Sequence, residues 1–153
     1  MGKKPETDNT PRAISVEVLY RDQQCGLPQA QTRWLRTQPE YHSLFRELRQ
    51  SYMGDQALPP PVDWSEYGVL LVAMGQKNTG GYGLALDGAG AALSDGVLGI
   101  TLQWREPQKG MMVTQVLTSP CILLKVPKSG FDRIEIKDQS GAIRLSSVTP
   151  HTP

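Results

Sequence analysis

The hydrophobic pattern in the second half of the chain is that of short β-strands. Apolar side chains fill residues 69–74 and 121–126 almost without a break, which is typical of strands covered on both faces. Residues 98–104 instead alternate between apolar and polar side chains, the pattern of a half-buried strand. Residues 134–136 and 143–145 alternate in the same way, and the turn-forming residues 138–141 between them predict a hairpin.

The first half of the chain combines strands with one helix. Residues 13–20 alternate and predict a single half-buried strand, and residues 32–36 predict a short extended piece. A helix is then expected to begin at Thr37, because a threonine cap is followed by Pro39 and Glu40 in the arrangement of a capping box.

The predicted helix has one apolar stripe that we expect to pack on a sheet. We expect the helix to end at Gly54, because glycine is the usual residue just past a helix C-terminus. The stripe consists of Tyr41, Leu44, Phe45, Leu48 and Tyr52.

The remaining connections complete the expected fold. The glycine-rich segment 75–82 joins 69–74 to 82–86, and we expect these two strands to pair across it. Residues 87–95 predict a loose bend, and residues 112–117 predict another strand. The chain is therefore expected to be mainly β with one amino-proximal α-helix, as an antiparallel β-sandwich or partly open barrel of about seven or eight strands.

The same pattern suggests how the chain is divided. Residues 1–12 are polar without apolar periodicity, so we expect a disordered tether, and residues 149–153 are expected to be a frayed tail. Residues 13–60 are expected to form an amino-terminal strand and a helix that packs on the sheet. Residues 61–148, which follow a proline-rich connector, are expected to form the β-rich domain.

Charge and composition argue against several classes of protein. The 153 residues carry a net charge of +1, so no basic stripe for nucleic acid is expected. No run approaches the roughly 20 apolar residues of a membrane helix. The two histidines, His42 and His151, do not complete a zinc site with the two cysteines at any familiar spacing, and we expect no metal.

No catalytic arrangement stands out, so we do not expect an enzyme or a cofactor. Ser43 follows His42 on the predicted helix, where neighbouring side chains diverge. A Gly-x-Ser-x-Gly elbow is absent. The glycines at 80–83 lack the Lys-Ser/Thr ending of a phosphate-binding loop.

The candidate binding residues lie in the segment 75–82. Its glycines, amide and hydroxyl groups suit recognition by a loop, but the same residues also suit a long turn. Two cysteines leave a second question open, because Cys25 and Cys121 could form a disulfide or be two unrelated buried thiols. The binding candidates in this segment are Lys77, Asn78, Thr79, Gly80, Gly81 and Tyr82.

Three motifs in order resemble the carboxy-terminal domain of the protease-complex subunit PrcB family. They are Pro-Val-Asp-Trp-Ser at 61–65, Gly-Gln-Lys-Asn-Thr-Gly-Gly-Tyr at 75–82, and Thr-Ser-Pro followed by an apolar strand from 118. The resemblance covers roughly residues 61–128. It implies a non-catalytic bacterial cell-envelope protein that binds another protein and associates with, or stabilises, a protease complex, with Pro120 added to the partner-binding residues.

The resemblance also bears on the cysteines and on location. Cys121 stands where the family commonly has an aromatic residue, which makes a bond to Cys25 more attractive, and we expect the disulfide. The family implies a periplasmic protein or an outer-membrane lipoprotein. Contact with a membrane is then expected only through a lipid anchor that lies outside this chain.

A second resemblance gives the alternative function. The loop from Asn78 to Tyr82 is similar to the Asn-Pro-Thr-Thr-Gly-aromatic loop of chagasin-type cysteine protease inhibitors, although the proline is missing and one threonine stands in place of two. Those inhibitors are immunoglobulin-like sandwiches. The alternative is therefore a protease inhibitor that acts through this loop.

Overall fold

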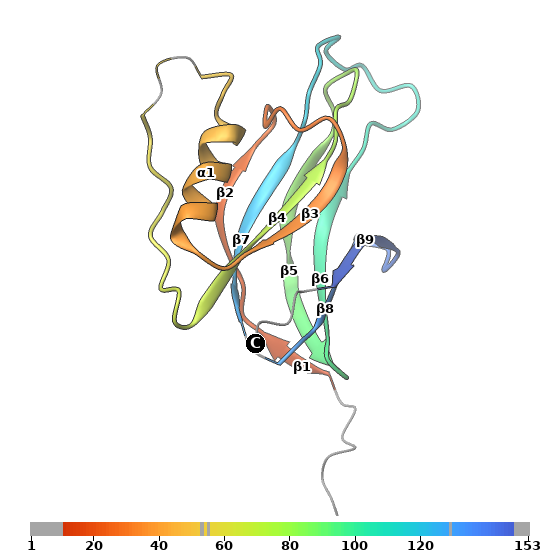
Figure 1. The fold of residues 1–153 in the computed structure, drawn as a ribbon. Coiled ribbons are helices and arrows are strands. Elements are labelled where there is room, and N and C mark those ends of the chain that lie inside the picture. The colour runs from red at the N-terminus through yellow and green to blue at the C-terminus, as the bar shows by residue number, and fades with distance from the viewer. Residues whose placement is uncertain (1–10, 53, 55, 129, 149–153) are drawn as a thin grey trace, which may run out of the picture.

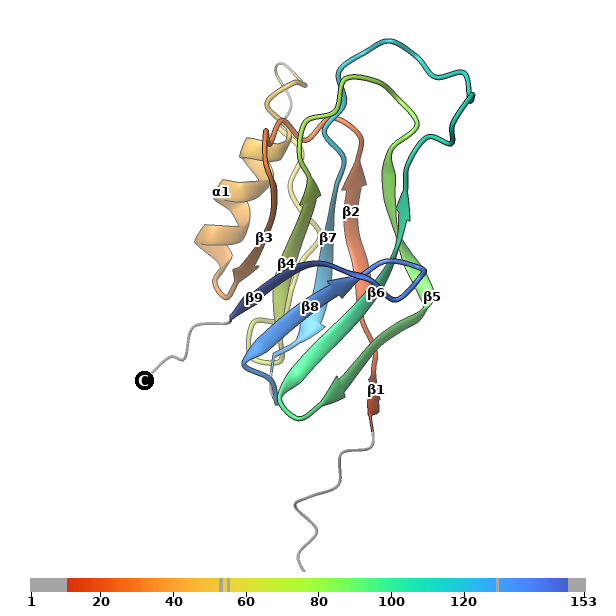
Figure 2. The same cartoon turned by 90° about the vertical axis from the view of Figure 1, so that its right-hand side faces the viewer.

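Two β-sheets pack face to face, and one α-helix covers the outer face of the smaller sheet (Figure 1, Figure 2). The structure is a computed structural model that describes residues 11–52, 54, 56–128 and 130–148. The elements are β1 (Arg12–Ile14), β2 (Glu17–Asp22), β3 (Ala30–Leu35), α1 (Gln38–Leu48), β4 (Tyr67–Met74), β5 (Gly83–Ser94), β6 (Val97–Arg105), β7 (Cys121–Pro127), β8 (Arg133–Lys137) and β9 (Ile143–Val148).

The order of the strands makes the fold a sandwich. One sheet has the order β2-β7-β4-β3 and the other has the order β1-β5-β6-β8-β9. Neighbouring strands are antiparallel, with the exception of β6 and β8, which run parallel. The predicted mainly-β fold with one helix is confirmed. The barrel alternative is not, because neither sheet closes on itself.

Strand β4 lies at the centre and is buried on both faces. Leu70, Val72 and Met74 point into the core between the two sheets. Val69, Leu71 and Ala73 point to the other side, into a second core beneath α1. Because side chains alternate along a strand, a strand with cores on both sides must be apolar at nearly every position. This explains the unbroken apolar runs of β4 and β7.

Helix α1 begins where the sequence predicts and ends earlier. The backbone N–H of Glu40 donates to the Oγ1 atom of Thr37 at 3.3 Å, so Thr37 is the N-cap. The helix ends at Leu48 rather than near Gly54, and Tyr52 lies outside it with 39% of its surface exposed. The predicted stripe otherwise packs on the sheet, through Tyr41, Leu44, Phe45 and Leu48. Within the described residues, α1 is too short and too polar to cross a membrane.

The single strand predicted for residues 13–20 is wrong, because this segment changes sheets. Residues 12–14 form β1, which pairs with β5 in the five-stranded sheet. From Glu17 the chain runs as β2 along β7 in the other sheet, with a register shift between Val18 and Tyr20. The alternation of apolar residues indicates which side chains are buried, but it does not say against which sheet.

The pairing predicted across the glycine-rich segment is also wrong. Strand β4 pairs with β3 and β7, whereas β5 pairs with β1 and β6. Residues 75–82 therefore do not close a hairpin; they carry the chain from one sheet to the other. Both hydrogen-bonding edges of β4 are already occupied, which leaves no edge for β5.

Two further predictions of local structure need correction. Residues 87–94 belong to β5, with a register shift between Leu86 and Ala91, and only the tight turn at Asp95 and Gly96 interrupts the chain before β6. Residues 112–117 form a loop rather than a strand. The predicted hairpin through 138–141 is confirmed as β8 and β9.

The amino-terminal half is part of the same sandwich. Strand β1 extends one sheet, and β2 and β3 form both edges of the other. Strands of both expected segments, 13–60 and 61–148, therefore lie in the same two sheets. The expected tether and tail, residues 1–12 and 149–153, lie outside the described residues except for the start of β1.

A disulfide joins the two halves of the chain. Cys25 and Cys121 are bonded, with their Cα atoms 6.0 Å apart and a separation of 96 positions in sequence. Both side chains are buried in the core beneath α1. The bond ties the connection between β2 and β3 to the first residue of β7.

We expect reduction of this disulfide to lower stability strongly. Closing a loop of this length removes unfolded-chain entropy worth about 4–5 kcal/mol in the chain-entropy model. Urea unfolding with and without a reductant should show the loss, and the Cys25→Ser/Cys121→Ser variant should reproduce it. An unchanged unfolding midpoint, after alkylation and mass measurement have shown that the bond was present and then reduced, would contradict the expectation.

Candidate functional site: a platform of three loops

Three loops meet at one end of the sandwich. Residues 23–29 connect β2 to β3, residues 75–82 connect β4 to β5, and residues 106–120 connect β6 to β7. The third loop projects furthest beyond the sheets (Figure 2). We call these three segments the three-loop platform.

The glycine-rich loop 75–82 is hydrogen-bonded along the loop 106–120. The N–H of Lys77 donates to the carbonyl of Thr118 at 2.7 Å, and the N–H of Thr118 donates back at 2.9 Å. The N–H of Gly80 donates to the carbonyl of Thr114 at 2.9 Å. The hydroxyl of Thr118 also donates to the carbonyl of Thr79 at 2.8 Å. Two motifs that lie far apart in sequence are therefore in direct contact.

The two glycines at the centre of this contact permit the close approach. A Cβ atom on Gly81 would lie 2.9 Å from side-chain carbons of both Pro107 and Val113, and the backbone of Gly81 has a φ of +94°. A Cβ atom on Gly80 would collide with the hydroxyl of Thr114. The two glycines thus allow the loops to pack closely, and Gly81 allows the left-handed backbone. This favours a role in the structure of the loop over direct contact of these glycines with a partner.

Ser119 connects the third loop, 23–29, to the other two. Its N–H donates to the carbonyl of Gln23 at 2.8 Å, its carbonyl accepts from the N–H of Cys25 at 3.0 Å, and its hydroxyl accepts from the N–H of Gly26 at 2.7 Å. The N–H of Gln76 donates to the carbonyl of Pro28 at 3.1 Å. Together with the disulfide, these bonds hold the platform as one piece.

The structure distributes the predicted binding residues over different depths. Asn78 is exposed, and its neighbours from Lys77 to Tyr82 are partly buried. The ammonium of Lys77 lies 5.2 Å from the centre of the Tyr82 ring, which itself packs on the inter-sheet core. Pro120 is buried and its carbonyl accepts from the N–H of Met74, so Pro120 presents no surface to a partner.

The most exposed apolar side chains of the platform are in or next to residues 112–117, which the sequence predicted as a strand. Met111 and Met112 have 54% and 95% of their surface exposed, and Val116 and Leu117 have 50% and 58% exposed. The sequence contained a signal of this, because the apolar residues at 111–113 and 116–117 neither alternate as in a half-buried strand nor form one continuous run as in a fully buried one.

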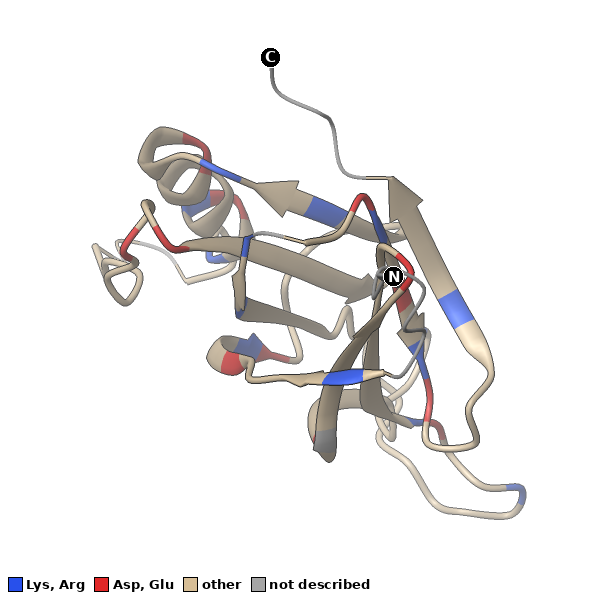
Figure 3. Cartoon of the chain, turned by 90° about the horizontal axis from the view of Figure 1, so that it is seen from below, with Lys and Arg blue, Asp and Glu red and all other residues tan. Residues whose placement is uncertain are grey.

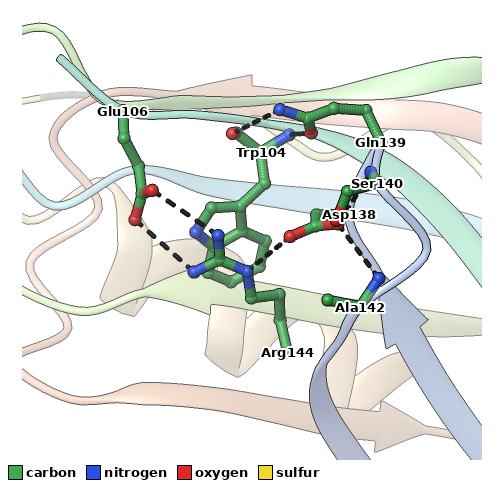
Figure 4. A network of polar contacts seen from close by, with 7 residues as sticks. All are labelled: Trp104, Glu106, Asp138, Gln139, Ser140, Ala142 and Arg144. Carbon is green, nitrogen blue, oxygen red and sulfur yellow. Dashed lines mark hydrogen bonds and ion pairs between the residues drawn. The ribbon is translucent and has the colours of Figure 1, made fainter. Parts of the chain in front are cut away.

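The base of the projecting loop is fixed by the hairpin of β8 and β9 (Figure 4). The side chain of Gln139 pairs with the backbone of Trp104, accepting at 2.8 Å and donating at 3.2 Å. The guanidinium of Arg144 lies 5.3 Å from the Trp104 ring and bridges Glu106 and Asp138. These contacts set the direction in which the chain leaves β6.

Asp138 is the centre of this hairpin network. Its carboxylate accepts from the hydroxyl and the N–H of Ser140, from the N–H of Ala142 and from the guanidinium of Arg144, at 2.6–3.1 Å. The hydrogen bonds from Ser140 and then Arg144 hold the pKa of Asp138 well below its ordinary value.

A cleft with two arginines borders the platform. It has a volume of about 310 Å³ and lies between β2 and strands β5 and β6, with Arg21 and Arg105 in its lining. Asp22 also lines it, but this carboxylate accepts the phenol hydroxyls of Tyr20 at 2.6 Å and Tyr52 at 2.7 Å. Burial raises the pKa of Asp22. The hydrogen bonds from the two phenols and from backbone N–H groups lower it by more, so the pKa lies below its ordinary value.

The electrostatics of the molecule as a whole are mixed. Lysines, arginines and carboxylates of both sheets and the helix are interspersed rather than gathered in one stripe (Figure 3). Among the described residues, no three histidine, cysteine, aspartate or glutamate side chains are grouped as metal ligands. What the platform offers chemically is non-covalent contact through apolar side chains, amides and a few cations.

Comparison with known proteins supports the resemblance drawn from the motifs. Residues 69–127 match the family model described as PrcB C-terminal. The match runs from β4 to β7 and includes two of the three platform loops. No curated protein and no solved structure matches the chain.

We expect Gly81→Ala to destabilise the protein by about 1–3 kcal/mol, because it combines a left-handed backbone with overpacking against Pro107 and Val113. Gly88→Ala is the matched control, since Gly88 has open space around it and no positive φ. It should stay within about 0.5 kcal/mol of the wild type. Chemical denaturation measures both, and equal effects of the two substitutions would contradict the packing role.

We expect Asp138 to contribute stability that depends on pH. Because its folded pKa is lowered, the contribution is fully present above the unfolded value of about 3.9 and is lost as pH falls through the folded pKa. Urea unfolding of the wild type and Asp138→Asn between neutral and acid pH tests this. The difference between the two proteins should shrink below about pH 4, and a constant difference would contradict the expectation.

Proposed function

We propose that this chain, which matches the PrcB C-terminal family over residues 69–127, is a non-catalytic protein-binding module of the bacterial cell envelope. Its partner site is the three-loop platform. The partner is a component of a protease complex, which the module associates with or stabilises. A lipid anchor is the proposed link to the membrane.

One observation carries the proposal. The Thr-Gly-Gly-Tyr and Thr-Ser-Pro motifs fold onto each other, and between them they hold the ends of a loop with four exposed apolar side chains. Binding residues are commonly placed on loops that a rigid scaffold positions. The family motifs are thus the support of the proposed site, and the exposed loop supplies its contact surface.

The disulfide supports the proposed compartment. Disulfides persist in the bacterial periplasm and on cell surfaces and are rare in the reducing cytosol. The bond between Cys25 and Cys121 is buried and holds two loops of the platform together. An oxidising compartment would therefore keep the proposed site assembled.

The alternative function is a protease inhibitor of chagasin-like type that acts through Asn78–Tyr82. Of these residues only Asn78 is exposed. Gly80 and Gly81 pack against the neighbouring loop 106–120. That packing favours the binding module over an inhibitory loop inserted into an active-site cleft. The two functions differ in whether the captured partner loses its catalytic activity.

Site-specific photo-crosslinking tests the proposal. A photoreactive phenylalanine at position 112 or 117, in protein expressed in its native host, should give one discrete adduct with an envelope protein. The same residue at position 143 is the control, because Ile143 is as exposed as Leu117, at 55% against 58%, but lies on β9. The adduct is identified by mass spectrometry, and the identified protein is purified and titrated.

The titration gives the deciding numbers. Leu117→Asp should weaken binding of the purified partner by at least about ten-fold, as expected for an apolar contact at an interface centre, and Ile143→Asp should not. Absence of an adduct at both platform positions, or the same adduct from position 143, would overturn the proposed site. If the partner is a cysteine protease that loses activity on binding, the inhibitor function replaces the proposed one.

A further inference from the structure

We propose that the three-loop platform recognises an apolar protein segment flanked by carboxylates. This inference rests on the proposed function and names the chemistry of the partner. Its basis is the exposure of the loop 106–120, the fixed backbone of that loop, and a set of three loops in which Glu106, paired with Arg144, is the single acidic residue.

Exposed apolar surface is concentrated in this loop. Nine large hydrophobic side chains of the described residues are well exposed, and Met111, Met112, Val116 and Leu117 are four of them. The other five lie on β2 (Val18), in the connection between α1 and β4 (Tyr52 and Leu58), and at the two ends of β9 (Ile143 and Val148). Isolated exposed apolar residues are ordinary, whereas a group within one loop marks a contact surface. Methionine side chains are adaptable and suit interfaces whose partner has an irregular apolar surface.

The loop holds these side chains on an ordered backbone. The carbonyl of Thr114 accepts from Gly80, the carbonyl of Leu117 accepts from the side chain of Gln24 at 3.0 Å, and Thr118 pairs with Lys77. These contacts fix the loop on both sides of Gln115. Less conformational entropy is therefore lost when a partner binds, which is the advantage of a preorganised site.

The charge of the platform is mainly positive. Residues 23–39, 67–86 and 107–131, which contain all of the platform except Glu106, include no aspartate or glutamate. The charged side chains in the three loops are Glu106 and the two cations Lys77 and Lys109. Glu106 is paired with Arg144.

The border of the platform adds to the positive charge. Asp22, the last residue of β2, already accepts two phenol hydroxyls and the N–H groups of Gln23 and Gln24. Arg21 and Arg105 line the neighbouring cleft, and neither guanidinium forms an ion pair with a carboxylate of the described residues. Complementarity of charge therefore selects a partner with carboxylates around its apolar contact.

A protein fits this surface better than a lipid bilayer does. Exposed amide side chains, Gln76, Asn78, Gln108 and Gln115, stand among the apolar ones. Burial of the loop in acyl chains would leave these amides without hydrogen-bond partners, at a cost of about 1–3 kcal/mol each. The polar rim of a protein partner can pair with them.

Fluorescence anisotropy with synthetic peptides tests the inference on the intact chain. The probe is a labelled peptide with a Leu-Phe-Leu centre flanked on both sides by glutamates. Its controls have glutamine flanks, lysine flanks or a serine centre. The glutamate peptide should bind at least about ten-fold more tightly than the glutamine peptide, and raising the salt from about 0.05 M to about 0.3 M should weaken it.

Variants connect the binding to the platform. Leu117→Asp should abolish binding of the glutamate peptide, whereas Ile143→Asp should leave it unchanged. Lys77→Gln combined with Lys109→Gln should reduce the preference for glutamate over glutamine flanks to about two-fold or less. Circular dichroism and unfolding midpoints confirm that each variant is folded.

Three outcomes would overturn the inference. They are equal binding of the glutamate and glutamine peptides, absence of binding to any peptide, and binding of phosphatidylcholine–phosphatidylglycerol vesicles that Leu117→Asp abolishes. If crosslinking identifies a protein partner while the glutamate peptide shows no preference, the inference fails alone. If the peptide binds as expected but no envelope protein crosslinks, the proposed function fails alone.

Discussion

The pairing of β4 with β7 is the interaction on which every other layer depends. Each strand contributes alternate side chains to the core between the sheets and to the core beneath α1. Their register places Leu70 opposite Leu124 in the core between the sheets and Leu71 opposite Leu123 in the core beneath α1, so both cores are filled from one ladder. Disruption of this pair would therefore disturb both cores at once.

The ends of the same two strands create the three-loop platform. Met74 donates to the carbonyl of Pro120, and from that point the chain turns into the glycine-rich loop on one side and the projecting loop on the other. Two segments that leave neighbouring strands at one edge must run side by side for a few residues. Gly80 and Gly81 are required there because any side chain at either position would meet the opposing loop.

This arrangement separates support from contact. The residues of the family motifs make the internal hydrogen bonds, whereas the exposed apolar residues lie between the motifs. Such a division lets the support stay the same while the contact residues differ from one protein to another. The disulfide and the hairpin network around Asp138 fix the platform from two further directions, through the loop 23–29 and through the end of β6.

The sequence by itself determined the local features of this protein. The cap at Thr37, the alternation of β6, the apolar runs of β4 and β7 and the hairpin of β8 and β9 could all be predicted. Each depends on side chains that are close in sequence. The loop at 75–82 could likewise be located, but not the orientation of its residues.

Only the tertiary structure decided which strands pair and which side chains remain exposed. Alternation shows which face of a strand is buried and does not identify the neighbouring strand, so β4 and β5 could be assigned to one hairpin although they lie in different sheets. The exposure of Met112 and Leu117 has the same cause, because the loop that carries them is held by hydrogen bonds to residues about 35 or more positions away.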